Sequence, residues 1–203
     1  YLQIIAEYNP DVSEGELQYY AGSPAFAEHF LRKKDRAWLF ELHPNDYKQL
    51  AARYEQHRSI RVQQSDGYKG LLSLLPPVSR RGLVMIDPSY EIKQDYQQVV
   101  DTLVQAHQRF ATGIYALWYP VVERARIKKL ESALINSGIR RIQLFELGVQ
   151  ADDRHAGMTA AGVIVINPPW RLREKLQPLL PKLAKQLTQD GRLHYRNVLL
   201  VDE

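Results

Sequence analysis

Cysteine is absent from this sequence of 203 residues, and several other features are missing with it. Without cysteine the chain can form no disulfide bond and no thiolate metal site. The six histidines show none of the short spacings that metal-binding motifs use. No apolar run reaches the length of about 20 residues that a membrane-spanning helix needs. The sequence therefore predicts a protein that uses no metal and does not span a membrane.

Composition and charge indicate a globular protein with a basic bias. The chain is 45% hydrophobic and 25% charged, which fits one globular domain, and its formal net charge is +4. Residues 1–60 hold seven Lys/Arg and nine Asp/Glu, so the remainder carries a net +6. This distribution is compatible with binding to nucleic acid but does not demand it.

Apolar runs and helical patterns alternate along most of the chain. Ser23 as an N-cap and Pro24 as the first helical residue predict a helix that runs to residue 31. Further helices are expected at 47–56, 71–75, 95–110, 121–137 and after Trp170. Strands are expected at 37–41, at 60–64, in the apolar part of the run at 82–90, and at 112–119, 141–147, 158–167 and 198–201. Strands that alternate with helices predict a mostly parallel, doubly wound α/β sheet.

The run at 82–90 carries the strongest indication of a functional site in this sequence. Its apolar part, which ends at the Asp87 carboxylate, is short, continuous and rich in Val, Ile and Leu, so this part is expected to be a strand buried on both faces. Asp87, Pro88 and Tyr90 follow at its carboxyl end, where open α/β sheets place their ligand sites. The alternative is that Asp87 and Pro88 only open a helix.

The same three residues suit methyl transfer to an exocyclic amine of a nucleobase. The lone pair of such an amine is delocalised into the ring, so the amine is a poor nucleophile. Two acceptors on its N–H bonds, the Asp87 carboxylate and the Pro88 carbonyl, would draw the lone pair out of conjugation. Tyr90 offers a face on which a flipped base can stack.

Acidic residues follow three successive expected strands, at Glu41, Asp66 and Asp87. In a nucleoside-binding Rossmann-like fold, an acid after the second strand can bind the ribose hydroxyls, and a polar residue after the third can bind the adenine amine. The alternative is that each acid caps the next helix, and Asp66, which precedes Gly67, is the best candidate for a simple cap.

Several motifs together resemble one known family, the bacterial 23S ribosomal RNA adenine-N6 methyltransferases, some of which have been described as proteins for using external DNA as a nutrient. The motifs that carry the resemblance are Tyr20-Ala21-Gly22-Ser23-Pro24, Glu41-Leu42-His43-Pro44, Asp66-Gly67, Pro76-Pro77-Val78-Ser79-Arg80-Arg81-Gly82, Asp87-Pro88-Ser89-Tyr90, Ala111-Thr112-Gly113-Ile114-Tyr115-Ala116-Leu117-Trp118-Tyr119-Pro120 and Gly157-Met158-Thr159.

The resemblance implies a Rossmann-like class I methyltransferase fold, S-adenosyl-L-methionine as the methyl donor, 23S ribosomal RNA as the partner and a cytoplasmic location. It implies a catalytic Asp87, which also contacts the cofactor, together with cofactor contacts at Ser23, Glu41, Asp66 and Gly67. Residues 21–203 would then form the methyltransferase domain, and residues 1–20 the end of an upstream or inserted helical segment.

Two departures from the family pattern stand out. Ser89 replaces a second proline, which leaves the two acceptors in place but removes some stiffness from the loop. The family's first strand, with its glycine-containing cofactor loop, has no counterpart in this sequence. We therefore expect the domain to be incomplete at its N-terminus and to hold only part of the cofactor pocket.

Basic and aromatic residues near the expected site are candidates for RNA contacts. Trp118 and Tyr119 could flank the flipped base, although both could equally be core aromatics of their strand. Phosphate contacts are expected from Arg80, Arg81, Arg124, Arg126, Lys128 and Lys129. The alternative for the last four is an ordinary solvated helix face. His107 is expected to be a packed histidine rather than a catalyst.

A second motif competes with the first. Asn167-Pro168-Pro169-Trp170, taken alone, fits an adenine-N6 methyltransferase signature better than Asp87-Pro88-Ser89-Tyr90 does. Its late position, after the basic helix and two further strands, favours a turn that stops a strand. Two other functions stay open: a DNA adenine-N6 methyltransferase, and a nucleic-acid-binding or uptake protein whose methyltransferase site has decayed.

Overall fold

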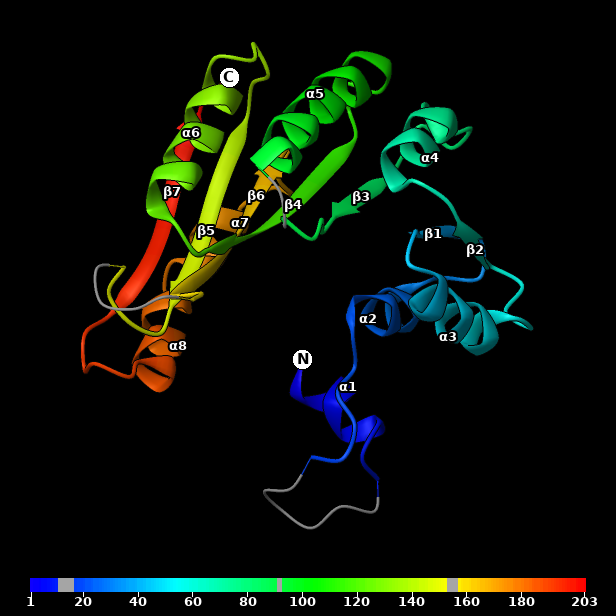
Figure 1. Ribbon diagram of the computed structural model, residues 1–203, viewed down its shortest axis with the longest axis horizontal. Coiled ribbons are helices and arrows are strands. Elements are labelled where there is room, and N and C mark those ends of the chain that lie inside the picture. The colour runs from blue at the N-terminus through cyan, green and yellow to red at the C-terminus, as the bar shows by residue number, and fades with distance from the viewer. Residues whose placement is uncertain (11–16, 91–92, 153–156) are drawn as a thin grey trace. The chain divides into compact units, whose positions relative to one another are not determined.

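The computed structural model describes residues 1–10, 17–90, 93–152 and 157–203 (Figure 1). Contacts between Cα atoms divide the chain into two compact units, residues 1–70 and 71–203. The boundary predicted between residues 20 and 21 falls inside the first unit and stays a prediction.

The first unit combines helices with a pair of parallel strands. Its helices are α1 (Leu2–Glu7), α2 (Ser23–Phe30) and α3 (Pro44–Tyr54). Strands β1 (Ala37–Glu41) and β2 (Ile60–Gln64) pair in parallel, with Glu41 opposite Gln64. Because α3 is the crossover between them, this unit has the βαβ connection that the alternating pattern predicted. Helix α4 (Gly67–Leu74) leads into the second unit.

The start of α2 differs from the prediction by one residue. Gly22 occupies the N-cap position, and Ser23 is already helical and makes no capping hydrogen bond with its side chain. A helix cap needs an extended backbone more than it needs a particular side chain, and Gly22 has that conformation, with φ −77° and ψ 174°. Pro24 lies in the first turn, as expected.

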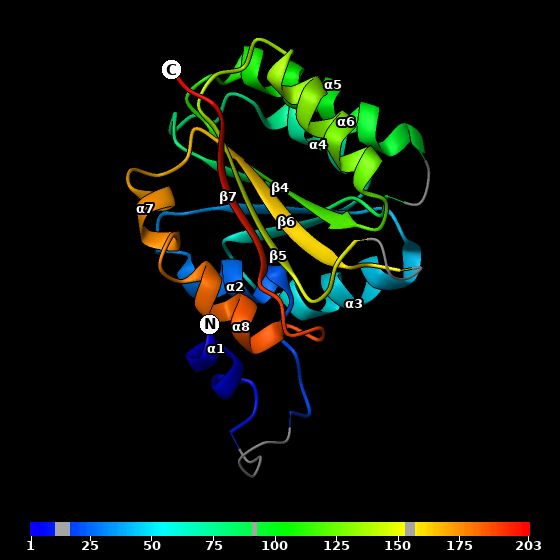
Figure 2. The same ribbon diagram turned by 90° about the vertical axis from the view of Figure 1, so that its left-hand side faces the viewer.

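The second unit is a five-stranded sheet with helices on both faces. Its strands are β3 (Leu83–Ile86), β4 (Ile114–Val121), β5 (Ile142–Gly148), β6 (Ala160–Ile166) and β7 (His194–Val201). Their order in the sheet is β3-β4-β6-β5-β7. Figure 2 shows α5 (Lys93–Arg109) and α6 (Arg124–Ile135) on one face, and α7 (Leu172–Leu176) and α8 (Leu180–Leu187) on the other.

The predicted mostly parallel sheet is wrong for this unit, which is mixed. Only β3 and β4 pair in parallel, whereas β4 with β6, β6 with β5, and β5 with β7 pair antiparallel. For β5 and β6 the cause is the length of their connection, because β5 ends at Gly148 and β6 begins at Ala160. Parallel neighbours need a crossover of a dozen or more residues, usually a helix, and this connection is shorter.

Burial alternates along β4. Tyr115, Leu117 and Tyr119 are at most 1% exposed, and the Tyr115 hydroxyl donates to the Ala106 carbonyl of α5, so this face lies under the helices. Strand β3 is not buried on both faces as predicted: Leu83 is 69% exposed and Met85 55%. In the described part of its sheet β3 is an edge strand, with β4 as its one neighbour.

No helix within the described ranges is both long enough and apolar enough to cross a membrane.

Candidate active site

Asp87 lies directly after β3, in the position that the sequence predicted. Residues 87–90 are not helical, so Asp87 does not cap a helix, and that alternative is wrong. The residue is exposed at the surface, yet the surrounding protein partly removes its carboxyl group from water, and this desolvation raises the pKa of Asp87. Among the described residues, no hydrogen-bond donor contacts this carboxyl group. The group is therefore available to accept hydrogen bonds from a ligand.

Tyr90 fixes the end of the Asp87 loop. Its φ is +54°, in the left-handed region that costs a bulky residue free energy. Its hydroxyl donates to the Trp118 carbonyl on β4 at 2.8 Å, and its ring lies 4.6 Å from that of Tyr96 on α5. Only 7% of the residue is exposed. The ring is thus largely covered by protein, and the predicted stacking role stays a prediction.

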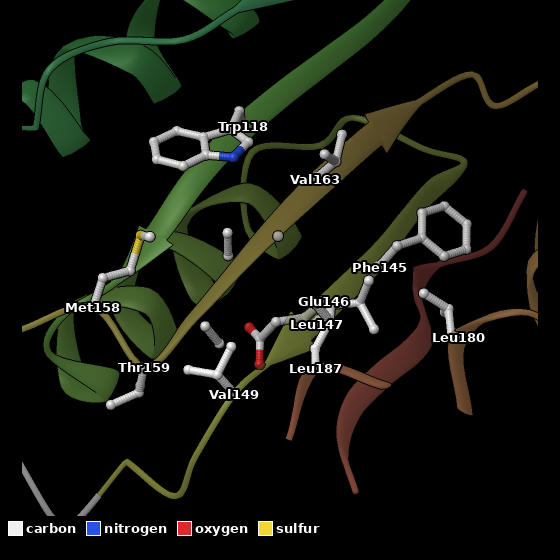
Figure 3. A pocket seen from close by; sticks show the side chains of 13 residues that line it. Trp118, Phe145, Glu146, Leu147, Val149, Met158, Thr159, Val163, Leu180 and Leu187 are labelled. Atoms are coloured by element: carbon white, nitrogen blue, oxygen red, sulfur yellow. The ribbon is translucent and has the colours of Figure 1, made fainter. Parts of the chain in front are cut away.

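Trp118 and Tyr119 lie on opposite faces of β4. Trp118 lines an open groove of about 360 Å³, whose walls are otherwise mostly aliphatic, with Phe145, Met158 and Val163 among them (Figure 3). Tyr119 is fully buried and donates its hydroxyl to Glu146 at 2.8 Å. This placement favours the core-aromatic alternative for Tyr119, whereas Trp118 borders open space and is tied to Tyr90 through its carbonyl.

Arg124, predicted to contact RNA, lies at the centre of an ion-pair network. Its guanidinium donates to both carboxylate oxygens of Glu146, at 2.8 and 2.7 Å, and to Asp152 at 2.6 Å. The Glu146 bond is the main cause of the raised pKa of Arg124. Thr159 donates to Asp152 as well, at 2.8 Å. The network fastens the start of α6 to β5 and to the turn that follows β5, which is a structural task.

The other basic candidates are more accessible. Arg126 pairs with Glu123 at 2.6 Å, and about a third of its side chain is exposed. Lys128 and Lys129 are exposed on α6, and Arg80 and Arg81 are exposed in the segment before β3. His107 packs on Tyr115 with ring centroids 6.4 Å apart, as expected, and burial lowers the pKa of His107.

The predicted cofactor residues of the first unit lie at neighbouring strand ends. Glu41 ends β1, and its carboxylate accepts the backbone N–H of His43 at 2.7 Å. Asp66 follows β2, and its carboxylate accepts the backbone N–H of Tyr68 at 2.8 Å, so Asp66 does cap α4. Gly67 is the first residue of α4, and Ser23 is exposed at the start of α2. Because β1 and β2 are parallel neighbours, Glu41 and Asp66 lie at the same end of this strand pair.

The competing motif lies at the other end of the second sheet. Strand β6 runs antiparallel to β4, so Asn167 follows the end of β6 at which β4 begins, opposite the end that carries Asp87. The Asn167 amide donates to the carbonyls of Ala111 and Gly113, at 2.7 and 2.8 Å. Both amide hydrogens are thus used to fasten β6 to the turn before β4, which supports the structural role predicted for this motif.

Sequence reasoning missed the acidic half of the ion-pair network. Glu146 is 4% exposed, and Arg196 of β7 lies 3.6 Å from it while pairing with Glu131 of α6 at 2.6 Å. The available signal was a single charged residue, a glutamate, inside a mostly apolar strand, because a charge in that position needs a partner. Within the part of the chain that the structure describes, no group of three or more His, Asp or Glu residues could hold a metal ion.

The chain is similar to known proteins along almost its whole length. The family model described as "Ribosomal RNA large subunit methyltransferase D, RlmJ" matches residues 1–200. An Escherichia coli K12 protein named ribosomal RNA large subunit methyltransferase J is 47% identical over 194 residues, which are 96% of this chain and 68% of that protein. Its namesake from Haemophilus influenzae is 47% identical over 176 residues, which are 87% of this chain and 63% of that protein. The chain spans about two thirds of the length of these relatives.

Solved structures give the same result for the fold. The crystal structure of a Legionella pneumophila protein matches with a TM-score of 0.87 and 32% identity, over 98% of this chain and 72% of that one. A crystal structure from Clostridium thermocellum matches with a TM-score of 0.50 and 12% identity, over 70% of this chain and 81% of that one, a likeness that bears on the fold alone. By the family model and by its curated relatives, this chain belongs to the ribosomal RNA large subunit methyltransferase J family.

Proposed function

We propose that this protein transfers a methyl group from S-adenosyl-L-methionine to the N6 amine of an adenine in 23S ribosomal RNA. The observation that carries the proposal is the Asp87 loop, in which an accessible carboxylate and the Pro88 carbonyl follow β3 on a backbone held by Tyr90. Family membership and the names of the two curated relatives support the reaction class. A ribosomal RNA substrate would be met in the cytoplasm.

The first unit offers residues that fit the nucleoside part of the cofactor. Carboxylates accept hydrogen bonds from ribose hydroxyls and from the adenine amine, and Glu41 and Asp66 lie at adjacent ends of parallel strands, where such ligands bind. Gly67 and Ser23, each in the first turn of a helix, would add contacts. The cofactor supplies a methyl group that its sulfonium already activates, so the protein's task is to bind, orient and exclude water. We infer no role for a metal.

Asp87 and Pro88 would bind the target amine. With its two N–H bonds directed at these acceptors, the nitrogen lone pair leaves the plane of the ring and becomes nucleophilic. Because the pKa of Asp87 is raised, the carboxylate loses its charge at a higher pH than an ordinary aspartate does. The rate of methyl transfer should therefore fall as the pH drops through that raised pKa.

Accessible side chains of the second unit would contact the RNA. We assign phosphate contacts to Arg126, Lys128 and Lys129 on α6, and to Arg80 and Arg81 before β3. Trp118 would flank the flipped base from the groove beside β4. Arg124 and Tyr119 are given no RNA contact, because their polar groups are already bound to Glu146.

The test measures methyl transfer from labelled cofactor to naked 23S ribosomal RNA, to ribosomal particles and to duplex DNA. We expect transfer to RNA and none to DNA, and mass spectrometry should find N6-methyladenine in the product. Asp87→Ala should abolish transfer while cofactor affinity stays within about tenfold, or about 1.4 kcal/mol. Asp101→Ala, an exposed aspartate on α5, is the matched control and should be fully active.

Three outcomes would contradict the proposal in different ways. Normal turnover by Asp87→Ala would remove the assigned catalytic residue. Transfer to duplex DNA in preference to RNA would indicate the DNA methyltransferase alternative. RNA binding without any cofactor binding would indicate a nucleic-acid-binding protein with a decayed site, and Ser89→Pro should then be tested for restored activity.

A further inference from the structure

The second sheet has a basic rim at the end opposite Asp87. Strands β3, β4 and β5 begin at this end, while β6 and β7 finish there, as the paired residues show. In Figure 1 it is the end of the sheet beside the C-terminus. The segments that meet here are residues 80–82, 109–113, 140–141, 167–174 and 202–203, and we call them the distal rim.

Hydrogen bonds connect these segments in sequence across the sheet. The Ile114 N–H donates to the Gly82 carbonyl at 3.1 Å, which joins the first segment to the second. The Asn167 amide joins the second to the fourth through the Gly113 carbonyl. Backbone bonds from Asn167 to Arg141, at 3.0 Å, and from Arg141 to Asp202, at 3.1 Å, complete the row. The distal rim is therefore one continuous surface rather than a set of separate loops.

Arginine dominates the charge of this surface. Every one of its arginines is exposed, and they are Arg80, Arg81, Arg109, Arg140, Arg141, Arg171 and Arg173. Its acidic residues are Glu174, Asp202 and Glu203. Glu174 pairs with Arg171 at 2.6 Å, and the Arg109 guanidinium also donates to the Leu72 carbonyl. Seven positive charges against three negative ones leave +4, which equals the formal charge of the whole chain.

Left-handed backbone conformations are concentrated in the distal rim. In the part of the chain that the structure describes, five residues other than glycine have a left-handed φ, and four of them are here: Arg80, Arg141, Asn167 and Arg171. Such conformations are costly and persist where the surroundings enforce them, often at functional sites. Three of the four are arginines, which have no local reason to adopt this conformation.

Trp170 projects from the same surface. It is 87% exposed, a rare state for the largest apolar side chain. The Arg171 guanidinium lies 5.6 Å from the centroid of its ring, and the Leu172 N–H donates to the Pro169 carbonyl at 3.0 Å to close the turn beneath it. The turn is thus fixed on one side by Asn167 and on the other by Leu172, which packs against the apolar cluster under α8.

We propose that the distal rim is a second RNA-binding surface, on which Trp170 stacks with an unpaired base while the arginines bind the flanking phosphates. Exposed aromatics beside arginines are the usual means of binding single-stranded RNA. The proposal rests on the proposed function, because it assumes an RNA substrate. Asp87 follows the four-residue strand β3 and lies five residues after Gly82, so at about 3.3 Å per residue it lies about 17 Å from the distal rim. Only an RNA large enough to reach both ends of the sheet could use both surfaces.

The experiment measures binding of this chain, without cofactor, to protein-free 23S ribosomal RNA and to a single-stranded oligoadenylate of about ten nucleotides. Trp170→Ala should weaken binding of the oligoadenylate about 5- to 100-fold, and Trp170→Phe should restore most of it, because any aromatic face can stack. Phe30→Ala, which removes a 70% exposed aromatic from α2, is the matched control and should bind normally.

A second pair of variants tests the arginines. Arg140→Gln combined with Arg173→Gln should lower the slope of log affinity against log salt by about 1.4, that is, about 0.7 for each phosphate of the single-stranded RNA that the protein no longer neutralises. Lys182→Gln combined with Lys185→Gln removes the same charge from the exposed side of α8 and should leave the slope unchanged.

The results separate this proposal from the methyltransferase assignment. Unchanged affinity and salt slope in the distal-rim variants would overturn the second surface, whether or not the protein methylates RNA. Binding through Trp170 without methyl transfer would contradict only the assigned reaction. If light scattering shows a dimer that Trp170→Ala dissociates, the surface binds a second copy of the chain, and the RNA proposal is wrong.

Discussion

Replacing Glu146 by alanine should destabilise the second unit more than any other single loss of charge in this sheet. The carboxylate is 4% exposed and accepts two bonds from Arg124, at 2.8 and 2.7 Å, and one from Tyr119 at 2.8 Å. Removing one partner of a buried ion pair costs about 3–5 kcal/mol, because the other charge stays buried without compensation. Arg124 is 23% exposed and keeps Asp152, which argues for the lower end of that range.

The buried Tyr119 hydroxyl adds to this cost. It would lose its acceptor where water cannot replace it, at about 1–3 kcal/mol, although the two losses are not fully additive. We expect a total of about 4 kcal/mol. For a chain of this size each kcal/mol shifts the melting temperature by about 2–4 °C, so Glu146→Ala should melt about 8–16 °C below the wild type.

Differential scanning calorimetry provides the measurement. Glu123→Ala is the matched control, because Glu123 forms an exposed pair with Arg126, and such pairs contribute about 0–1 kcal/mol. Glu146→Gln should fall between the two, since its amide oxygen still accepts from Tyr119. If Glu146→Ala melts within about 3 °C of Glu123→Ala, the network does not stabilise the fold and the reasoning above is refuted. In that case a double-mutant cycle of Glu146→Ala with Arg124→Ala would give a coupling free energy near zero for this pair.

Three further predictions concern single side chains. Burial raises the pKa of Asp87, so the charged form is disfavoured in the folded state, and Asp87→Asn should have a higher melting temperature than the wild type at pH 7. This difference in melting temperature should disappear as the pH falls towards about 4. An equal difference at both pH values would contradict the prediction. Asn167→Ala should lower the free energy of unfolding by about 2–4 kcal/mol, through two lost hydrogen bonds and an alanine in the left-handed conformation, with little effect on methyl transfer. Asn167→Gly removes the same hydrogen bonds without the backbone strain, so it should lower the free energy of unfolding less. A folded but inactive Asn167→Ala protein would instead indicate that this motif is catalytic. Burial lowers the pKa of His107, so the free energy of unfolding should be independent of this histidine's charge above about pH 6.5 and should decrease below that pH. In urea titrations, His107→Gln should show a smaller decrease than the wild type. Identical pH profiles for the two proteins would refute this prediction.

The sequence alone located most elements and the Asp87 loop. The ends of β1 and β2 agree with their predicted ranges, and Asp87 follows β3 as expected. These features depend on local signals: apolar runs of strand length, proline and glycine at the ends of elements, and a helix between parallel strands. The family resemblance was confirmed for the same reason, because its motifs are contiguous in the chain.

Other features depend on which segments meet, and only the tertiary structure decided them. Strand β6 pairs antiparallel with both of its neighbours, β4 and β5, and an alternating pattern of strands and helices could not show that the sheet is mixed. Arg124 looked like one of several basic residues on a helix, but Glu146 comes from a distant strand and binds it. The distal rim gathers five segments that are far apart in the sequence. A charged side chain has one identity in the sequence and many possible partners, and the fold determines which partner it binds and whether water or protein surrounds it.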